Sequence, residues 1–184
     1  MDLSIIIVNY KTKDLTLQAL ASVFNAQAPR DKPEVILVDN ASDDDTAEIV
    51  RKKFPQVKVI EAPANLGFAG GNNLGFRRAK GRYQLLLNSD TLVEPETFIK
   101  MVEYMDENPK VGLSTCRVEL KNGRIDPASH RGFPTPWASL TYYLGLEKLF
   151  PQSHRNRYLL FKAHYWNWLN LRIPDSGATI QNTN

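Results

Sequence analysis

The sequence predicts an α/β fold whose mainly parallel sheet is covered by helices on both faces. Short apolar runs rich in Val, Ile and Leu alternate with longer segments of helical periodicity through about residue 120. The runs are nearly continuous in apolar residues, as strands buried on both faces are. Several of them end abruptly in polar residues. Strands that alternate with helices in this way are typical of a parallel sheet.

The first elements follow directly from these patterns. Residues 3–8 form a β-branched run that predicts a buried strand. Apolar residues near helical spacing predict a helix over about 13–27, which Pro29 and Pro33 end. A second apolar run predicts a buried strand over 34–38.

A helix start signal follows the second strand. Ser42, with Asp45 three residues later, resembles a capping box and predicts a helix that ends near Lys53. A third strand is predicted over 57–60. A glycine-rich segment, 65–75, then leads into a further helix.

That helix is expected to end at Gly81, before a fourth strand over 83–87. Pro95 suits the first position of the next helix, since its missing N–H needs no partner there. This helix extends to about Glu107. A fifth strand is predicted over 111–120.

Beyond these elements the sequence pattern is weaker. Residues 121–124 predict a hairpin turn, because Asn-Gly readily adopts positive φ angles. Helices are expected over 138–149 and 158–171, separated by a break at Pro151.

The composition changes near residue 127, which predicts a first part of residues 1–126 and a second part of residues 127–184. The second part is aromatic, and over 127–174 Glu147 is the only acid. Its basic residues are Arg131, Lys148, Arg155, Arg157, Lys162 and Arg172. Such a stretch suits a membrane surface. The favoured interpretation is instead packing against a further part of the protein, which would leave an apolar patch that is exposed or covered by self-association.

Composition also excludes several protein classes. Cys116 is the only cysteine, which excludes a disulfide scaffold and a cysteine-rich zinc site. The chain shows neither a secretory leader nor an apolar run of membrane-spanning length, so we expect a cytoplasmic location. The balanced charge of residues 1–126 argues against a general nucleic-acid binder.

Polar residues that directly follow the predicted strands are the candidates for function, because ligands of open α/β sheets bind past the carboxyl ends of strands. They are Asn9, Tyr10 and Lys11, then Asp39, Asn40 and Ser42, and finally Asn88, Ser89 and Asp90. The loop after the first strand has no glycine, so it is neither a Rossmann fingerprint nor a P-loop. A nucleotide diphosphate would therefore need a hard cation, which Asp90 could bind.

Four segments together resemble a known family. They are Asp2–Tyr10, Val38–Ser42, Asn65–Gly75 and Leu85–Thr91. In order and spacing they look like family 2 glycosyltransferases, and most of all like bacterial rhamnosyltransferase-like members that build cell-surface polysaccharide. The resemblance covers about residues 2–120, and residues 131–137 also look like that subgroup. It implies a GT-A fold and transfer of a sugar from a UDP- or dTDP-linked donor to a hydroxyl, with inversion.

The resemblance also implies roles for individual residues. Asn9, Tyr10 and Asp39 would hold the nucleoside, and Asn65, Asn72 and Asn73 would line the donor site. Asn88, Ser89 and Asp90 stand where the family has its Asp-x-Asp motif, with an amide replacing the first acid. Asp90 would then be the main ligand of a Mg²⁺ or Mn²⁺ ion on the diphosphate.

Structural alternatives stay open for these residues. Asp39 and Asp90 could instead cap helices or turns. The glycines of 65–75 could allow close helix–sheet packing rather than form a donor-site loop. The acids of 43–45 fit a solvated helix start better than a metal site.

The resemblance weakens at the last residues of the sequence. Asp175–Ala178 resembles an element that, in family members, precedes an acidic motif supplying the catalytic base, and no acidic pair follows it here. The base is therefore unknown, and we expect donor binding to be more intact than turnover. The alternative is a truncated, catalytically inactive module that binds a nucleotide sugar or a partner protein. A sugar nucleotidylyltransferase is disfavoured because its glycine-rich opening loop is absent.

The expected partners follow from the same resemblance. They are a nucleotide-sugar donor and a saccharide or lipid-linked acceptor, with no nucleic acid. Peripheral contact with the cytoplasmic face of a membrane and homo-oligomer formation are further options.

Overall fold

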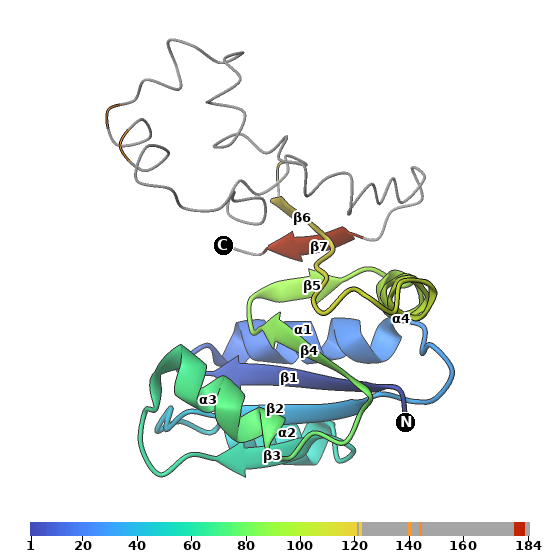
Figure 1. Cartoon of the computed structure of the whole chain (residues 1–184). Helices are drawn as coiled ribbons and strands as arrows, with labels where there is room; N and C mark the ends of the chain where they lie inside the picture. The colour runs from blue at the N-terminus through green and yellow to red at the C-terminus, as the bar shows by residue number, and fades with distance from the viewer. Residues whose placement is uncertain (121, 123–139, 141–143, 145–178, 183–184) are drawn as a thin grey trace. The chain divides into compact units, whose positions relative to one another are not determined.

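The structure is a computed structural model that describes residues 1–120, 122, 140, 144 and 179–182 (Figure 1). The chain divides into one compact unit of residues 1–122 with 178–184 and another of residues 123–177. The expected boundary near residue 126 stays a prediction. Apart from single positions, the predicted turn at 121–124 and the helices over 138–149 and 158–171 lie outside the described residues.

The described elements alternate as the sequence predicts. In chain order they are β1 (Leu3–Asn9), α1 (Lys13–Asn25), β2 (Glu34–Asp39), α2 (Thr46–Lys53), β3 (Lys58–Glu61), α3 (Gly67–Phe76), β4 (Tyr83–Asn88), β5 (Thr91–Val93), α4 (Thr97–Glu107), β6 (Arg117–Leu120) and β7 (Thr179–Asn182). The central sheet has the order β3-β2-β1-β4, and its strands are all parallel. The predicted mainly parallel sheet is thereby confirmed. In a second sheet β7 lies between β5, to which it is antiparallel, and β6, to which it is parallel.

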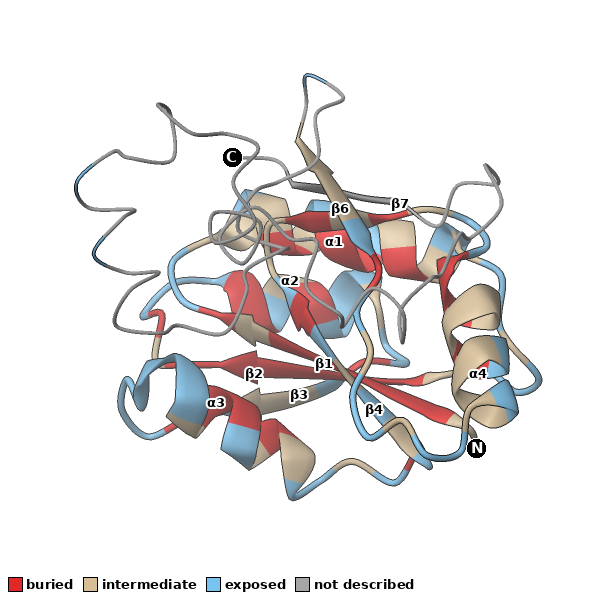
Figure 2. Cartoon of the chain, turned by 45° about the horizontal axis from the view of Figure 1, so that its top comes forward, coloured by how far each residue is buried: buried red, intermediate tan, exposed pale blue. Residues whose placement is uncertain are grey.

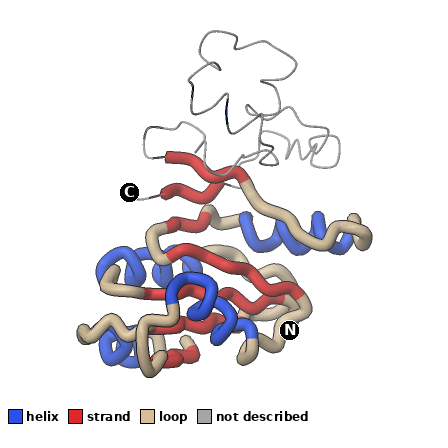
Figure 3. The backbone as a smooth tube through the Cα atoms, turned by 60° about the vertical axis from the view of Figure 1, so that its left-hand side comes forward, coloured by secondary structure: helices blue, strands red, loops and turns tan. Residues whose placement is uncertain are grey.

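The two central strands, β1 and β2, are buried on both faces. Successive side chains of a strand point to opposite faces of the sheet, so these strands contribute to a core on each side. Ile5 and Ile7 belong to one core cluster with residues of α1, α2 and α4. Ile6 belongs to a second cluster, in which Ile36 and Val38 pack against residues of α3. Figure 2 shows the buried strands at the centre, and Figure 3 shows helices on either side of them.

The glycine-rich segment is a helix, not the predicted loop followed by a helix. A Cβ added at Gly75 would lie 2.4 Å from Ile6 Cγ2, and one added at Gly71 would lie 2.8 Å from Val8 Cγ1. These glycines therefore let α3 approach the sheet more closely than any other residue would. At Gly71 and Gly75 the structure therefore shows close packing of the helix against the sheet, which was the alternative interpretation of these glycines.

Other element boundaries also differ from the predictions. The capping box is wrong: α2 begins at Thr46, and the Ser42 hydroxyl bonds Asp39 instead of capping the helix. Pro95 lies in a turn before α4, which begins at Thr97. The fifth predicted strand is shortened to Arg117–Leu120, and the short strand β5 was not predicted.

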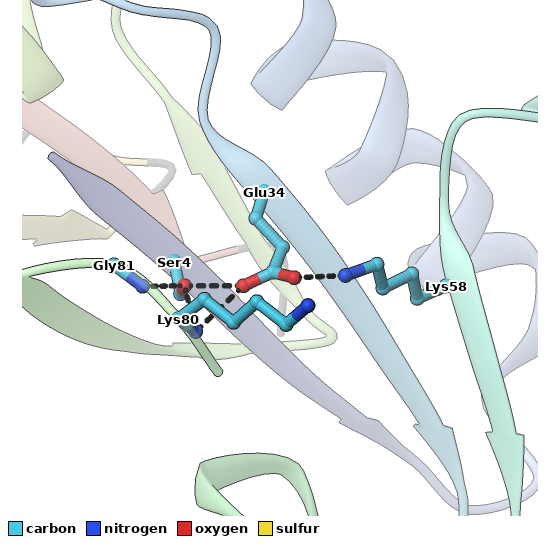
Figure 4. Close-up of polar contacts among 5 residues, drawn as sticks. All are labelled: Ser4, Glu34, Lys58, Lys80 and Gly81. Carbon is cyan, nitrogen blue, oxygen red and sulfur yellow. Dashed lines mark hydrogen bonds and ion pairs between the residues drawn. The ribbon is translucent and has the colours of Figure 1, made fainter. Parts of the chain in front are cut away.

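A buried polar network joins three strands at the amino-terminal edge of the central sheet (Figure 4). The Ser4 hydroxyl donates a 2.6 Å hydrogen bond to Glu34, and Lys58 forms an ion pair with the same carboxylate. The backbone N–H of Lys80 donates hydrogen bonds to both Ser4 and Glu34, and the backbone N–H of Gly81 donates one to Ser4. Burial alone would raise the pKa of Glu34, but the hydrogen bonds from Lys58, Ser4 and Lys80 outweigh it and hold the pKa below 4.5. This network fixes the entry of β4 beside β1.

Candidate functional site

The loops at the carboxyl-terminal edge of the sheet have an unusual backbone. Within the described part of the chain, the residues with positive φ are Lys11 (56°), Ala41 (60°), Asp43 (55°) and Gly67 (69°). They lie in the loops that follow β1 and β2 and at the start of α3. Residues other than glycine rarely have a positive φ, and those that do cluster at functional sites.

Asn9, the last residue of β1, is the centre of a buried hydrogen-bond network. Its side chain is fully buried. Its Oδ1 accepts from the hydroxyls of Thr12 and Thr16, each at 2.9 Å. Its Nδ2 donates to Asp39 Oδ1 at 2.9 Å and to Ser42 Oγ at 2.8 Å. The amide is thereby held in one orientation, with its nitrogen toward the end of β2.

Asp39 ends β2 and is 6% exposed. Its Oδ1 accepts from the Asn9 amide and from the Ser42 hydroxyl. The Ser42 oxygen in turn accepts from the backbone N–H of Lys11 at 3.1 Å. Among the described residues, none donates a hydrogen bond to Asp39 Oδ2. Oδ2 is therefore the oxygen of this carboxylate that is left to accept a further hydrogen bond.

Asn40 joins the end of β2 to the loop that precedes α3. Its Oδ1 accepts from the backbone N–H of Leu66, and its Nδ2 donates to Asn65 Oδ1, both at 2.9 Å. Asn65 Oδ1 also accepts from the N–H of Gly67 at 2.8 Å. The start of α3 is thereby held beside the carboxyl-terminal edge of the sheet.

A cleft of about 280 Å³ opens between these loops. It is lined by Val8, Tyr10, Thr12, Asn40, Asn65, Gly67, Phe68 and Ser89. Ser89 comes from the turn after β4, and its hydroxyl lies 3.0 Å from that of Thr12. Three parallel strands and α3 therefore contribute to the cleft. A second cleft, of about 250 Å³ between α1 and β5, is not lined by any of the predicted site residues.

The structure brings most of the predicted site residues to this edge. Tyr10, Asn65 and Ser89 line the cleft, while Asn9 and Asp39 lie in the network beneath the adjoining loops. Asn88 and Asp90 flank Ser89, and the Asn88 carbonyl accepts a 2.6 Å hydrogen bond from the Thr91 hydroxyl.

The two predicted site residues on α3 lie away from this network and do not line the cleft. Asn72 is buried and donates to the Phe68 carbonyl of its own helix, and Asn73 is exposed on α3. Conversely, Thr12 was not among the candidates, and Asn40 and Ser42 were candidates by position but were given no role in binding. Their role depends on contacts across the fold, which their sequence positions do not reveal.

Comparison with known proteins agrees with this arrangement. The family model described as glycosyl transferase family 2 matches residues 4–166. The poly(ribitol-phosphate) beta-glucosyltransferase of Bacillus spizizenii is 32% identical over 162 residues, which cover 83% of this chain and 25% of that protein.

Solved structures of glycosyltransferases share the fold. Staphylococcus aureus TarS 1-349 in complex with UDP-GlcNAc has a TM-score of 0.55 at 27% identity, over 73% of this chain and 37% of that one. A mannosyltransferase of Pyrobaculum calidifontis in complex with GDP-Man and Mn²⁺ has a TM-score of 0.56 at 27% identity, over 64% of this chain and 34% of that one. The predicted GT-A-type sheet is thereby confirmed.

The chain spans about a quarter to a half of the length of the curated relatives it matches. Among the described residues, no helix is both long and apolar enough to cross a membrane. The extent of the family match, together with the shared fold, settles the classification. The chain belongs to glycosyl transferase family 2.

Proposed function

We propose that this chain binds a nucleotide-diphosphate sugar and forms the donor-binding part of a glycosyltransferase. The enzyme would transfer the sugar from a UDP- or dTDP-linked donor to a hydroxyl, with inversion, in the synthesis of cell-surface polysaccharide. The observation that carries this proposal is the hydrogen bond by which Asn9 holds Asp39 at the ligand-binding edge of the sheet. The TarS complex with UDP-GlcNAc supports a uridine nucleotide as donor.

The geometry suggests different roles for the residues of this network. Asp39 Oδ2 would accept a hydrogen bond from the donor nucleoside, since its other oxygen is already bonded. Asn9 would act as a positioning residue, because both hydrogens of its amide are donated within the protein. Tyr10 and Asn65 would contact the donor from the walls of the cleft. Asn73, exposed on the adjacent helix, stays a candidate for the sugar end of the donor.

The turn of Asn88, Ser89 and Asp90 would hold the diphosphate end of the donor. Among the described residues, no three acidic, His or Cys side chains gather into a ligand set of their own. Mg²⁺ often binds through one or two carboxylates together with substrate phosphates and water, so a single carboxylate at Asp90 fits such an ion. A bound Mg²⁺ or Mn²⁺ would neutralise charge on the leaving diphosphate.

The proposal about the acceptor is supported only by the similarity to related proteins. A saccharide or lipid-linked acceptor agrees with the poly(ribitol-phosphate) beta-glucosyltransferase among them. Transfer to a hydroxyl needs a general base, and we assign that role to none of the described residues.

A thermal shift experiment tests donor binding. The chain would be heated with UDP, dTDP or GDP, each with and without Mn²⁺. A ligand at 100 times its Kd adds about 2.7 kcal/mol, which raises Tm by roughly 5–10 °C at this size. We expect Asp39→Ala to remove the shift and Asp90→Ala to remove its dependence on Mn²⁺. Glu103→Gln, on the exposed face of α4, is the matched control and should keep both.

Two results would change the proposal. If no nucleotide shifts a sample that unfolds cooperatively, the chain does not bind a donor and the proposal is wrong. If donors bind but no labelled sugar reaches a ribitol-phosphate or saccharide acceptor, the chain is a nucleotide-sugar-binding module. A sugar-transfer assay on the same protein preparation therefore accompanies the thermal shift.

A further inference from the structure

Two aromatic side chains line the cleft but are largely exposed. Tyr10 is 43% exposed in the loop after β1, and Phe68 is 64% exposed in the first turn of α3. Phe68 has no ring partner among the described residues, where the one stacked pair is Phe24 with Phe54. Exposed apolar surface of this size inside a cleft favours contact with a ligand.

The position of Phe68 on its helix explains its exposure. Gly71, Asn72 and Gly75 are the buried residues of α3, and they lie three, four and seven positions after Phe68. Residues at this spacing share one face of a helix, so Phe68 is on the face that packs against the sheet. Gly71, one turn later, already lies against Val8, next to the last residue of β1. Phe68 therefore extends past the end of the sheet, over the cleft.

The other residues that line the cleft indicate what kind of group fits beside these rings. Among the described residues that line it, none is charged. Amides of Asn40 and Asn65 and hydroxyls of Thr12 and Ser89 supply the polar contacts. A volume of about 280 Å³ lies just under the range that holds a drug-sized ligand, so it suits one part of a nucleotide sugar. Among the parts of a nucleotide sugar, the nucleobase is the uncharged, planar, hydrogen-bonding group whose faces can stack on aromatic rings.

We propose that Phe68 stacks on the nucleobase of the donor. This inference rests on the proposed function, since it assumes that a nucleotide sugar binds here. Aromatic rings and bases stack through their faces, and alanine in place of such a ring weakens binding measurably. Phe68 would thus contribute to the affinity for the nucleobase, while Asp90 would act at the diphosphate end of the donor.

Isothermal titration of the full chain with two ligands tests the proposal. UDP contains the base, and ribose 5-diphosphate lacks it, each with Mn²⁺ present. We expect Phe68→Ala to weaken UDP binding about tenfold, equivalent to about 1.4 kcal/mol, and to leave ribose 5-diphosphate binding unchanged. Phe68→Trp should keep most of the UDP affinity, whereas Phe68→Leu should lose most of it, because leucine is apolar but cannot stack.

Leu113→Ala is the matched control, since Leu113 is 88% exposed and does not line the cleft. Because Phe68 is also exposed, none of its variants should lower the Tm of the free protein. If wild type binds UDP and Phe68→Ala binds it equally well, the stacking inference is wrong while the proposed function stands. Equal weakening for UDP and ribose 5-diphosphate would place Phe68 away from the base and would also overturn it. If wild type binds no nucleotide, both proposals fail.

Discussion

Asn9 and Asp39 are register partners at the ends of β1 and β2, and a 2.9 Å hydrogen bond joins their side chains. Neighbouring parallel strands bring their carboxyl ends to one edge, so residues 30 positions apart in sequence become adjacent. The bond uses Oδ1 of the carboxylate, and no described residue donates to Oδ2. The pair therefore links the stability of the sheet edge to the geometry of the site.

Replacing Asn9 should affect stability and binding together. Asn9→Ala removes the acceptor of the buried Thr16 hydroxyl and a donor to Asp39. Because buried polar groups left without partners cost about 1–3 kcal/mol, we expect a loss of roughly 2–3 kcal/mol in the free energy of unfolding. Urea titration measures it, and UDP affinity should fall as well. Asn73→Ala, on the exposed side of α3, should change stability by less than about 0.5 kcal/mol. An Asn9→Ala protein as stable as wild type would contradict this account.

Glu34 should make stability depend on pH in the acid range. Its folded-state pKa lies below its ordinary value of 4.5, so the unfolded chain takes up the proton first as pH falls. The stability due to Glu34 is therefore complete above about pH 4.5 and is lost as pH falls through the folded pKa. Glu34→Gln should be less stable by about 2 kcal/mol at pH 7, because it loses the charge-assisted bond from Lys58.

Urea unfolding from pH 7 down to pH 3 tests this expectation. The stability difference between wild type and Glu34→Gln should shrink toward acid pH. Glu48→Gln, on the exposed face of α2, changes the same charge and should follow wild type throughout. A difference that grows toward acid pH would refute the sign of the pKa change.

Gly75 should not tolerate even one added methyl group. Gly75→Ala places a Cβ 2.4 Å from Ile6 Cγ2, so α3 must move away from the sheet. Overpacking of this kind typically costs about 1–3 kcal/mol, so we expect the free energy of unfolding to fall by about 2 kcal/mol. Gly112→Ala is the matched control, because a Cβ there meets nothing within 4 Å. Thermal unfolding should separate the two variants by several degrees, and equal Tm values would show that α3 is not held against the sheet.

Cys116 should react slowly in the folded protein. It is 7% exposed, and burial raises the pKa of its thiol to about 11. At pH 8 only about one thiol in a thousand would be ionised, and the thiolate is the reactive form. A thiol-specific chromogenic reagent should therefore modify the native chain far more slowly than the chain in urea. Cys116 is the only cysteine, so the signal is unambiguous. Rapid, complete modification without denaturant would contradict its burial.

The four strands of the central sheet and most helices could be predicted because their signals are local, whereas the short strands β5 and β7 were not predicted. An apolar run such as 34–38 or a helical period such as 13–27 is visible within one segment. The glycines of α3 were harder to interpret, because the reason for Gly75 is the side chain of Ile6 on another element. The same holds for Ser42, whose spacing to Asp45 suggested a helix cap while its actual partners lie on β1 and β2.

By itself the sequence determined the parallel α/β architecture, the family and the polar residues that follow the strands. Hydrophobic periodicity and motif spacing are properties of contiguous segments, so no three-dimensional contact is needed to recognise them. Only the tertiary structure decided which of those polar residues meet: Asn9 with Asp39, and Tyr10 with Ser89 around one cleft. It also brought Phe68 of α3 to the same cleft. Such pairings depend on strand order and on how closely α3 packs, and both are set by the burial of side chains distant in sequence.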